Sequence, residues 1–510
     1  MLRQVINIFR IGKTVGTIRF STEADKKKRA RKFLMELLGS SRGVSTKVGQ
    51  FLSLGNGDSD LTDAFKESVP PMSREEVVQV LNQNYAGDYR TVFKKLDWQA
   101  RAASLGQVHR AVLTTGEKVA VKVRYAGIDG CVEDELKLLG WLPNMGPVRK
   151  WGMDFGDYVE EFRVHFKEEL DYRLEADRQL RYESCARAIP GIVVPHVYKE
   201  QCRDGVLVQS WEEGMSLENA CSLNEEQRQG LGKIFLTHYL HMLFREGLLH
   251  SDPNPDNFAF VAKKNRLQVI LYDFGSLFEI GPTQRLILLR IILALRYREA
   301  LDPMACLAGL GFDTAKLNDL KPQLPALLEV LFEPFNEDAP VDLADWDLNR
   351  RWDEIAGELK WWFRSAAPPS ALFLMRSLHG LATHLRSLDA RLSWRWILDE
   401  VAGDLYREAR ELSIPALVPA NGSGAVTFSG LSRYLKVHVE KGNGNRVSLT
   451  MPARVVDSLE EVIDPPVLES IKKNEIDLDE VKAKVQKSGY APQTLFEVQD
   501  PERMVQVWLE

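Results

Sequence analysis

The sequence predicts an α+β protein of several domains, and three patterns along the chain carry this prediction. Two β-rich runs, at residues 108–113 and 118–123, are joined by the turn Thr114-Thr115-Gly116-Glu117. From residue 215 to about 412 the spacing of apolar residues is mainly helical, and alternating strand patterns return after residue 425. Because 510 residues exceed one ordinary core, we expect domains with the following boundaries: 1–95, 96–213, 214–414 and 425–510.

The composition indicates a folded protein in a reducing compartment. The net charge of −6 predicts no general attraction to nucleic acid. The five cysteines are far apart and contain no Cys-x-x-Cys pair, which indicates free thiols. The most apolar run, residues 285–296, contains three arginines, so we predict a buried or amphipathic helix and no transmembrane segment.

Residues 1–38 form a basic, amphipathic segment that begins a helical N-terminal extension. Val5, Ile8 and Phe9 can share one helical face, and the charged run 26–32 follows. We favour a helix packed on the next domain with a solvated basic flank, and a membrane-surface helix is the alternative. The expected localisation is therefore cytoplasmic, and the alternative adds peripheral contact with a membrane.

Lys122 is the first residue with candidate chemistry. It lies in the apolar run Val119-Ala120-Val121-Lys122-Val123. A strand of this kind in a kinase holds its lysine over the α- and β-phosphates of ATP. A lysine in a strand is more often a solvated edge residue, so this interpretation depends on the motifs downstream. A partly buried ammonium also needs a carboxylate partner.

Two short motifs supply the expected reaction centre. Asp252 and Asn257 are five positions apart within residues 250–258, and Asp273-Phe274-Gly275 follows. This order and spacing match the catalytic loop and the Asp-Phe-Gly motif of protein kinases. We predict that Asp252 orients or deprotonates a nucleophile, while Asn257 and Asp273 bind Mg²⁺ that bridges the ATP phosphates. A proline-rich turn that resembles the loop by chance is the alternative, and the second motif argues against it.

The expected phosphate-binding loop departs from the glycine-rich form. It reads Arg101-Ala-Ala-Ser-Leu-Gly-Gln107 and directly precedes the first β-rich run. Alanine narrows the backbone conformations that glycine permits, so we expect coverage of the nucleotide with altered affinity or phosphate geometry. The predicted nucleotide-binding residues in this loop are Ala102, Ala103, Ser104, Gly106 and Gln107.

With these motifs, the chain resembles the UbiB (AarF) family of atypical protein-kinase-like proteins over roughly residues 40–400. The further motifs that carry the resemblance are Lys47-Val48-Gly49-Gln50 (the family's KxGQ), Ala102–His109 and Glu169-Leu170-Asp171 (its ExD). The resemblance implies a protein-kinase-like two-lobe fold whose helical KxGQ extension packs over the active site. Lys47 would project as a catalytic residue towards Glu169 and Asp171, with Gln50 also at the nucleotide, and Glu175 would pair with Lys122.

The resemblance also implies a function. Members of this family bind ATP (or ADP) with Mg²⁺ and hydrolyse ATP, and they are associated with isoprenoid-quinone (ubiquinone) biosynthesis or lipid homeostasis and with membrane surfaces. The extension would block phosphorylation of other proteins. The alternatives are a conventional protein kinase and a nucleotide-gated lipid-binding chaperone or scaffold without significant turnover.

Two features limit the transfer of family properties. Residues 154–187 are helical by periodicity, and on one regular helix Glu169 and Asp171 would point about 200° apart. Either the helix is interrupted near Leu170, or the two side chains do not both touch the nucleotide. Bacterial members often end in membrane-spanning helices, whereas residues 425–510 predict a small α+β domain with hairpins at 434–450 and 494–509. We interpret this domain as an interaction or regulatory module with a protein partner.

Overall fold

The computed structural model describes most of the chain beyond residue 70. The described residues are 71–510, apart from residues 104, 129–154, 264–265, 415–424, 429, 442–445, 464–467, 469–470, 475 and 501–502. They divide into two compact units. The first unit takes the described residues up to Ile234 together with Leu248–Glu279 and Pro369–His384. The second takes Phe235–Gly247, Ile280–Pro368 and Leu385–Glu510, and the domain boundaries expected from the sequence stay predictions.

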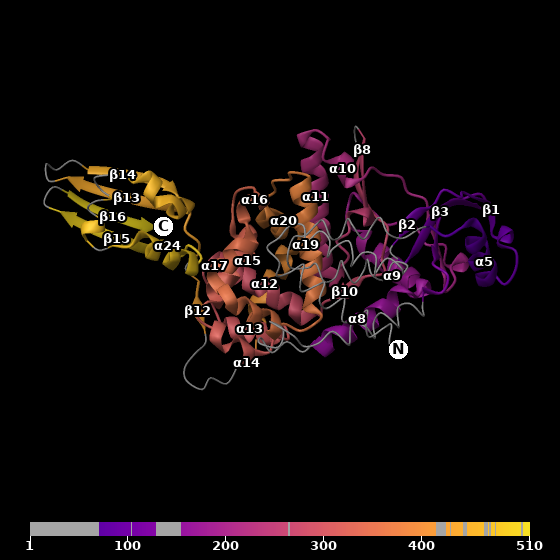
Figure 1. The fold of residues 1–510 in the computed structure, drawn as a ribbon, viewed down its shortest axis with the longest axis horizontal. Coiled ribbons are helices and arrows are strands. Elements are labelled where there is room, and N and C mark those ends of the chain that lie inside the picture. Colours follow the sequence, from indigo (N-terminus) through magenta and orange to yellow (C-terminus); the bar gives the residue numbers. More distant parts are fainter. Residues whose placement is uncertain are drawn as a thin grey trace, which may run out of the picture. The chain divides into compact units, whose positions relative to one another are not determined.

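The first unit contains a five-stranded antiparallel sheet (Figure 1). Its order is β1-β3-β4-β6, with β2 paired to β3. The strands are β1 (Phe93–Leu96), β2 (Arg101–Ala103), β3 (Gly106–Leu113), β4 (Lys118–Arg124) and β6 (Val206–Ser210). The strand pair predicted from the two β-rich runs is confirmed, and Gly116 in its turn has a φ of +109° that favours glycine.

Buried and less buried side chains alternate along β4, and Lys122 lies on the face of the sheet that is less buried. Val119, Val121 and Val123 point to the other face, where each has 0% exposure. Helix α5 (Arg74–Asn84) packs against β4, and these residues share one hydrophobic core. Two short 3-10 helices lie in the connections, η1 (Tyr89–Thr91) and η2 (Lys199–Gln201).

The helical segment that contains the ExD motif is interrupted. Helix α8 (Phe155–Glu169) ends at Glu169, and α9 (Tyr172–Ala186) begins three residues later. Asp171 is the N-cap residue of α9, and its carboxylate accepts hydrogen bonds from the backbone N–H groups of Arg173 and Leu174 at 3.0 and 3.1 Å. Of the two alternatives expected from the sequence, the structure shows the interrupted helix, with the break at Leu170.

Short strands position the two kinase-like motifs. A three-stranded sheet has the order β5-β9-β8, and β7 pairs with β10. The elements are β5 (Ile192–Val193), β7 (Leu248–His250), η4 (Pro255–Asn257), β8 (Phe258–Lys263), β9 (Arg266–Leu271) and β10 (Leu277–Glu279). The loop with Asp252 and Asn257 thus connects β7 to β8, and Asp273 follows the end of β9. Further helices of this unit are α10 (Leu217–Ala220), α11 (Glu225–His241) up to Ile234, and α19 (Ala371–Ser387) up to His384.

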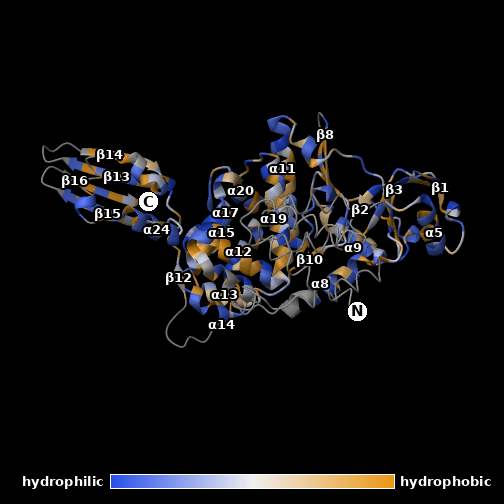
Figure 2. Ribbon diagram, in the orientation of Figure 1, coloured by the Kyte–Doolittle hydropathy of each residue, from blue (hydrophilic) through white to orange (hydrophobic). Residues whose placement is uncertain are grey.

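The second unit begins with a group of helices around α12 (Pro282–Tyr297). The predicted buried helix at residues 285–296 is confirmed, because Leu289, Ile291 and Leu293 of α12 each have 0% exposure, and Figure 2 shows hydrophobic colouring along it. The other helices are η3 (Met242–Glu246), α13 (Pro303–Gly309), α14 (Thr314–Leu317), η5 (Asn318–Leu320), α15 (Leu324–Asn336), α16 (Leu343–Trp346), α17 (Leu348–Ala356), η6 (Gly357–Leu359), α18 (Lys360–Ala366), α20 (Trp394–Ala402), η7 (Gly403–Leu405) and α21 (Tyr406–Glu411). Strands β11 (Ala300–Leu301) and β12 (Val426–Thr427) form a small antiparallel pair.

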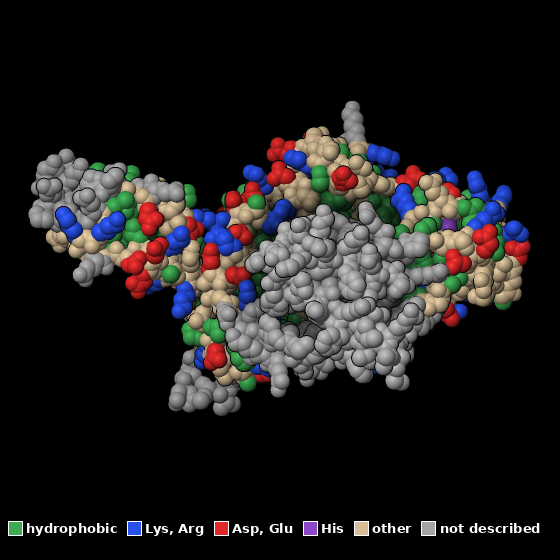
Figure 3. Space-filling model, in the orientation of Figure 1, with side chains coloured by type: hydrophobic (Ala, Val, Ile, Leu, Met, Phe, Trp, Pro, Cys, Tyr) green, Lys and Arg blue, Asp and Glu red, His purple; other side chains and the backbone are tan. Residues whose placement is uncertain are grey.

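The C-terminal part of the second unit has its own sheet and core. The predicted hairpins are confirmed, since β13 pairs with β14 and β15 with β16 in the order β14-β13-β16-β15. The elements are β13 (Tyr434–Lys441), β14 (Arg446–Pro452), η8 (Ala453–Ser458), α22 (Leu459–Val462), α24 (Leu478–Lys487), β15 (Gln493–Asp500) and β16 (Arg503–Leu509). The visible described surface of this part carries acidic and basic side chains intermixed (Figure 3).

The predicted α+β class is confirmed by these sheets and helices. Among the helices of the described residues, none combines the length and the apolar character that crossing a bilayer requires.

Candidate nucleotide and phosphoryl-transfer site

Lys122, Glu175 and Asp273 form a buried charge cluster in the first unit. The Lys122 Nζ donates to Glu175 Oε1 and Oε2 at 2.8 and 2.9 Å and to Asp273 Oδ2 at 3.0 Å. Burial lowers the pKa of Lys122, but the two carboxylates outweigh burial and hold that pKa well above its ordinary value. The ammonium is therefore charged at neutral pH, and the expected pairing of Lys122 with Glu175 is present.

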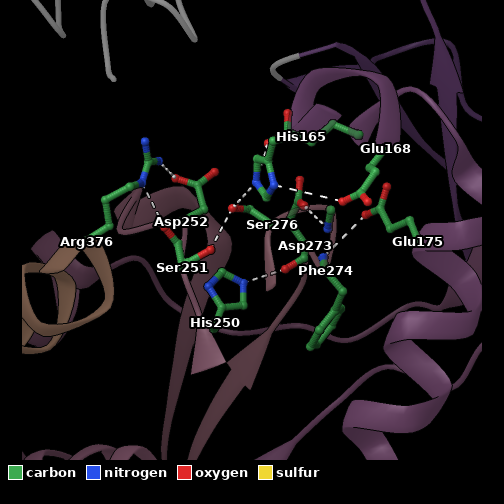
Figure 4. Close-up of polar contacts among 12 residues, drawn as sticks. His165, Glu168, Glu175, His250, Ser251, Asp252, Asp273, Phe274, Ser276 and Arg376 are labelled. Carbon is green, nitrogen blue, oxygen red and sulfur yellow. Dashed lines mark hydrogen bonds and ion pairs between the residues drawn. The ribbon is translucent and has the colours of Figure 1, made fainter. Parts of the chain in front are cut away.

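Three separate elements bring this cluster together. Lys122 lies on β4, Glu175 lies in the first turn of α9, and Asp273 follows β9. The Phe274 backbone N–H also donates to Glu175 Oε1 at 3.4 Å, and Tyr172 lies with its ring centroid 5.0 Å from the Lys122 Nζ (Figure 4 shows Glu175 and Phe274). The break at Leu170 starts α9 close to the site, so its first turn can supply Glu175.

Asp252 is buried within the catalytic loop. Asp252 is 4% exposed, and its Oδ1 accepts from the Asn254 backbone N–H at 3.3 Å. Pro255 opens the single 3-10 turn that ends at Asn257, and the Asn257 carbonyl accepts from the Tyr272 N–H at 3.0 Å. This hydrogen bond joins the catalytic loop to the segment that leads from β9 to Asp273. The two predicted metal ligands, Asn257 and Asp273, are therefore held in neighbouring segments.

The donor set suits Mg²⁺ held jointly with a phosphate group. Asp273 offers a carboxylate and Asn257 a neutral amide oxygen, and both are hard oxygen donors. The Asn257 Nδ2 is buried and makes no hydrogen bond within the described residues. Those residues also contain no cluster of three His, Cys, Asp or Glu side chains that could hold a metal. Magnesium ions in phosphoryl-transfer sites usually take further ligands from substrate oxygens and water.

The structure separates the two acidic residues of the ExD motif. Glu169 is 7% exposed and lies beside the Asp-Phe-Gly motif, since a Cβ placed on Gly275 would be 3.5 Å from the Glu169 Cγ. Asp171 is exposed and caps its own helix. Glu169 is therefore near the predicted metal ligands, and the predicted contact of Asp171 with nucleotide is not supported by the direction of its side chain.

The alanine-rich loop is a tight hairpin between β2 and β3. Ala102 pairs with Gln107 and Ala103 pairs with Gly106. Gly106 has no room for a side chain, because a Cβ there would overlap the Val123 carbonyl oxygen. Close contact with the backbone of β4 is therefore sufficient to require glycine at position 106, whether or not the loop binds phosphate.

Gln107 does not share the face of Lys122. Val108 is the residue paired with Lys122, so Gln107 and His109 point to the opposite side of the sheet. The Gln107 Oε1 accepts from the Met72 N–H at 2.8 Å, and its Nε2 lies 2.8 Å from the His109 Nε2. The prediction that Gln107 binds nucleotide is therefore not supported, and its side chain instead links β3 to the start of α5. Lys47, Gln50 and Ser104 lie outside the described residues.

A second hydrogen-bonded chain, not predicted from the sequence, connects α8 to the catalytic loop. The His165 Nε2 lies 2.7 Å from the Ser276 Oγ, which lies 2.7 Å from the Ser251 Oγ (Figure 4). The Ser251 N–H also donates to the Ser276 carbonyl at 3.0 Å. The residues after Asp-Phe-Gly and before Asp252 are thus joined directly, and no sequence motif signals this.

Helix α19 also reaches the catalytic loop, although it begins more than 100 residues later. Arg376 contacts Asp252, the Ser377 Oγ donates to the His250 carbonyl at 2.8 Å, and the His384 ring packs on Phe258. In the sequence, Arg376, Ser377, Gly380 and His384 recur at helical spacing on α19, but nothing in this pattern shows which segment they contact.

Residues 64–302 match the family model of the ABC1 atypical kinase-like domain. The chain is 25% identical over 242 residues to the atypical kinase COQ8, mitochondrial, of Saccharomyces cerevisiae, a match that covers 46% of this chain and 48% of that protein. It is 30% identical over 269 residues to the Protein ACTIVITY OF BC1 COMPLEX KINASE 1, chloroplastic, of Arabidopsis thaliana, covering 51% of this chain and 39% of the relative. The chain therefore spans less than half of the length of these two curated relatives.

A solved structure supports the same fold. The chain is similar to Rv3197 of Mycobacterium tuberculosis, solved in complex with erythromycin, with a TM-score of 0.50 and 24% identity, covering 74% of this chain and 97% of that one. At this identity the likeness shows the fold alone. Together with the family match, it confirms the predicted resemblance to UbiB (AarF) proteins and the kinase-like fold.

Proposed function

Because the chain carries an ABC1 atypical kinase-like domain of the UbiB type, we propose that it binds Mg-ATP and uses it in slow hydrolysis or phosphoryl transfer. The observation that carries the proposal is the Lys122–Glu175–Asp273 cluster beside Asp252 and Asn257. Lys122 would bind the α- and β-phosphates, and Asn257 and Asp273 would hold the magnesium ion. Bound magnesium would neutralise charge on the transferred phosphoryl group.

Asp252 would orient the attacking nucleophile in this proposal. Its carboxylate is buried in a loop fixed by Pro253 and Pro255, so little rearrangement is needed before reaction. Glu169 lies beside Gly275, where it would face the metal and phosphates, and Lys47 and Gln50 would complete the site from the KxGQ motif. Ala102, Ala103, Ser104 and Gly106 would cover the phosphates.

We further propose a setting in isoprenoid-quinone biosynthesis or lipid homeostasis. The name COQ8 of the yeast relative and the UbiB resemblance support this setting. Phosphorylation of other proteins would be blocked by the N-terminal extension, and the C-terminal domain would bind a protein partner. Residues 1–38 would pack on the next domain in a cytoplasmic protein, and a peripheral contact of this segment with a lipid surface is the alternative.

Two substitutions at the site test the reaction. Asp273→Asn removes a metal-binding charge, so we expect loss of both MgADP-induced thermal stabilisation and ATP hydrolysis, with a fall in turnover of about 100-fold or more. Asp252→Asn should retain MgADP stabilisation and lose turnover. The control is Asp204→Asn, an exposed surface residue whose partner is Arg173.

These experiments distinguish the proposed reaction from the alternative functions of this site. Wild-type protein that neither binds MgADP nor releases phosphate contradicts the proposal. Nucleotide-dependent stabilisation without phosphate release would instead indicate the nucleotide-gated scaffold, and labelling of many proteins in a trans-phosphorylation screen would indicate a conventional kinase. Deletion of the gene, with quinone and lipid profiling and complementation by wild type and by Asp273→Asn, tests the proposed setting.

A further inference from the structure

One face of helix α19 follows the catalytic loop along its length. Arg376 lies at Asp252, Ser377 at His250, and His384 at Phe258. Between them Gly380 leaves room for the loop, because a Cβ on Gly380 would be 2.9 Å from the Pro253 Cβ. The loop is therefore braced by side chains at helical spacing, and one of these is a charged residue that touches the predicted catalytic aspartate.

Arg376 makes two different contacts with neighbouring loop residues. Its Nε donates to the Ser251 carbonyl at 2.9 Å, and its Nη2 lies 3.4 Å from Asp252 Oδ1 (Figure 4). The side chains of Arg376 and Asp252 are only 6% and 5% exposed. A planar guanidinium that holds a carbonyl and the next residue's carboxylate at once fixes the direction of that carboxylate.

The energetics of such a pair favour a positioning role over a stabilising one. Burying two charges carries a large desolvation penalty, so a buried ion pair often adds little net stability compared with apolar residues. The contact of the Arg376 guanidinium with both the Ser251 carbonyl and the Asp252 carboxylate fixes the direction of the group that would orient the nucleophile.

We propose that Arg376 is a positioning residue for phosphoryl transfer, which fixes the direction of the Asp252 carboxylate. This inference rests on the proposed function. Because Arg376 would act through Asp252 and touch neither nucleotide nor metal, its loss should lower kcat and leave nucleotide binding unchanged. A role confined to the stability of the fold would instead lower the melting temperature without this kinetic split.

The experiment compares Arg376→Gln and Arg376→Lys in the full-length protein. We expect Arg376→Gln to lower kcat for ATP hydrolysis by about 10- to 100-fold, the loss typical of a misplaced catalytic group, with the KM for MgATP within about twofold. Arg376→Lys keeps the charge but lacks the forked geometry, so its loss of kcat should be smaller. If the glutamine variant does not fold, the lysine variant carries the test alone. Its kcat must then fall, with unchanged stabilisation by MgADP.

A double-mutant cycle identifies Asp252 as the residue through which Arg376 acts. In the Asp252→Asn background, Arg376→Gln should have little further effect on the residual kcat, because the residue it positions has already lost its charge. The matched control is Arg386→Gln, an exposed arginine on the same helix, which should retain wild-type kcat.

Three results would overturn the inference. The first is wild-type kcat in the Arg376 variants, and the second is a change in KM alone. The third is a double mutant whose kcat falls by the product of the two single-mutant losses, because the two residues would then act independently. Failure of the proposed function is a different result, since the wild type itself would then show neither MgADP stabilisation nor phosphate release.

Discussion

His384 shows how a single buried side chain can make this fold sensitive to acid. It has 0% exposure, its ring centroid lies 4.7 Å from that of Phe258, and its Nδ1 lies 2.7 Å from the Gly380 carbonyl oxygen. Burial lowers the pKa of His384 to about 4, the Gly380 carbonyl opposes that change, and His250 adds to it. The ring is therefore neutral in the folded protein, whereas an unfolded chain would protonate it near pH 6.5.

We predict that His384 destabilises the protein as the pH falls from 6.5 towards 4. In this range the unfolded state takes up a proton that the folded state does not, so stability is lost on acidification, by about 2 kcal/mol at pH 4.5. His384→Leu should remove this part of the acid sensitivity in melting or urea-unfolding experiments at pH 7.5 and 4.5. His438→Leu, on a strand of the C-terminal sheet, is the control. Equal pH dependence in wild type and His384→Leu would contradict the prediction.

At the scale of elements, the junction of α8 and α9 assigns different tasks to Glu169 and Asp171. Asp171→Asn keeps a good N-cap and removes the charge, so it should preserve both stability and MgADP binding. Asp171→Ala removes the cap and should lower stability by about 1 kcal/mol. Glu169→Gln should alter MgADP affinity, measured by calorimetry, with little change in melting temperature. Loss of nucleotide binding in Asp171→Asn would show that this carboxylate turns to the nucleotide.

Sequence motifs predict some of the site residues on these elements but not the direction of every side chain. The sequence predicts Lys122, Asp252, Asn257 and Asp273 as site residues, because each lies in a short motif whose spacing reflects its chemistry. The face on which Gln107 lies depends on strand register, which a loop motif alone does not specify.

Contacts between distant segments were beyond such reasoning. Arg376 meets Asp252 across 124 positions, and a sequence pattern can show that a helix has a polar face without showing what covers it. The spacing of Glu169 and Asp171 predicts an interruption at Leu170 as one of two alternatives, because two residues at that spacing cannot share a helical face, and the structure shows this interruption.

At the scale of the whole molecule, the second unit holds its C-terminal sheet through α17 and Tyr490. Arg351 of α17 is 3% exposed, forms an ion pair with Glu333 and lies with its guanidinium carbon 5.9 Å from the Tyr490 ring centroid. The Tyr490 hydroxyl donates to the Asp457 carboxylate at 2.7 Å. A small set of side chains thus connects the helices to a domain that has its own core.

Tyr490→Ala should loosen this connection without changing the nucleotide site. We expect faster hydrogen exchange in β13–β16 and a stability loss of about 3 kcal/mol, because a packed ring and its hydrogen bonds are removed. MgADP stabilisation should persist, since the proposed nucleotide ligands within the described residues all belong to the first unit. Tyr434→Ala, at a side chain 49% exposed, is the control. Unchanged exchange in β13–β16 would argue against this anchoring role.

The late position of α19 has a consequence for the order in which the protein becomes active during its synthesis. Asp252 leaves the ribosome 124 residues before Arg376, which at about 5–20 residues per second is a delay of about 6 to 25 seconds. During that interval a nascent chain can contain every kinase-like motif and still lack the helix that braces the catalytic loop. A chain truncated between Gly275 and Arg376 would therefore contain all the kinase-like motifs and, under the proposed function, lack the helix that positions Asp252.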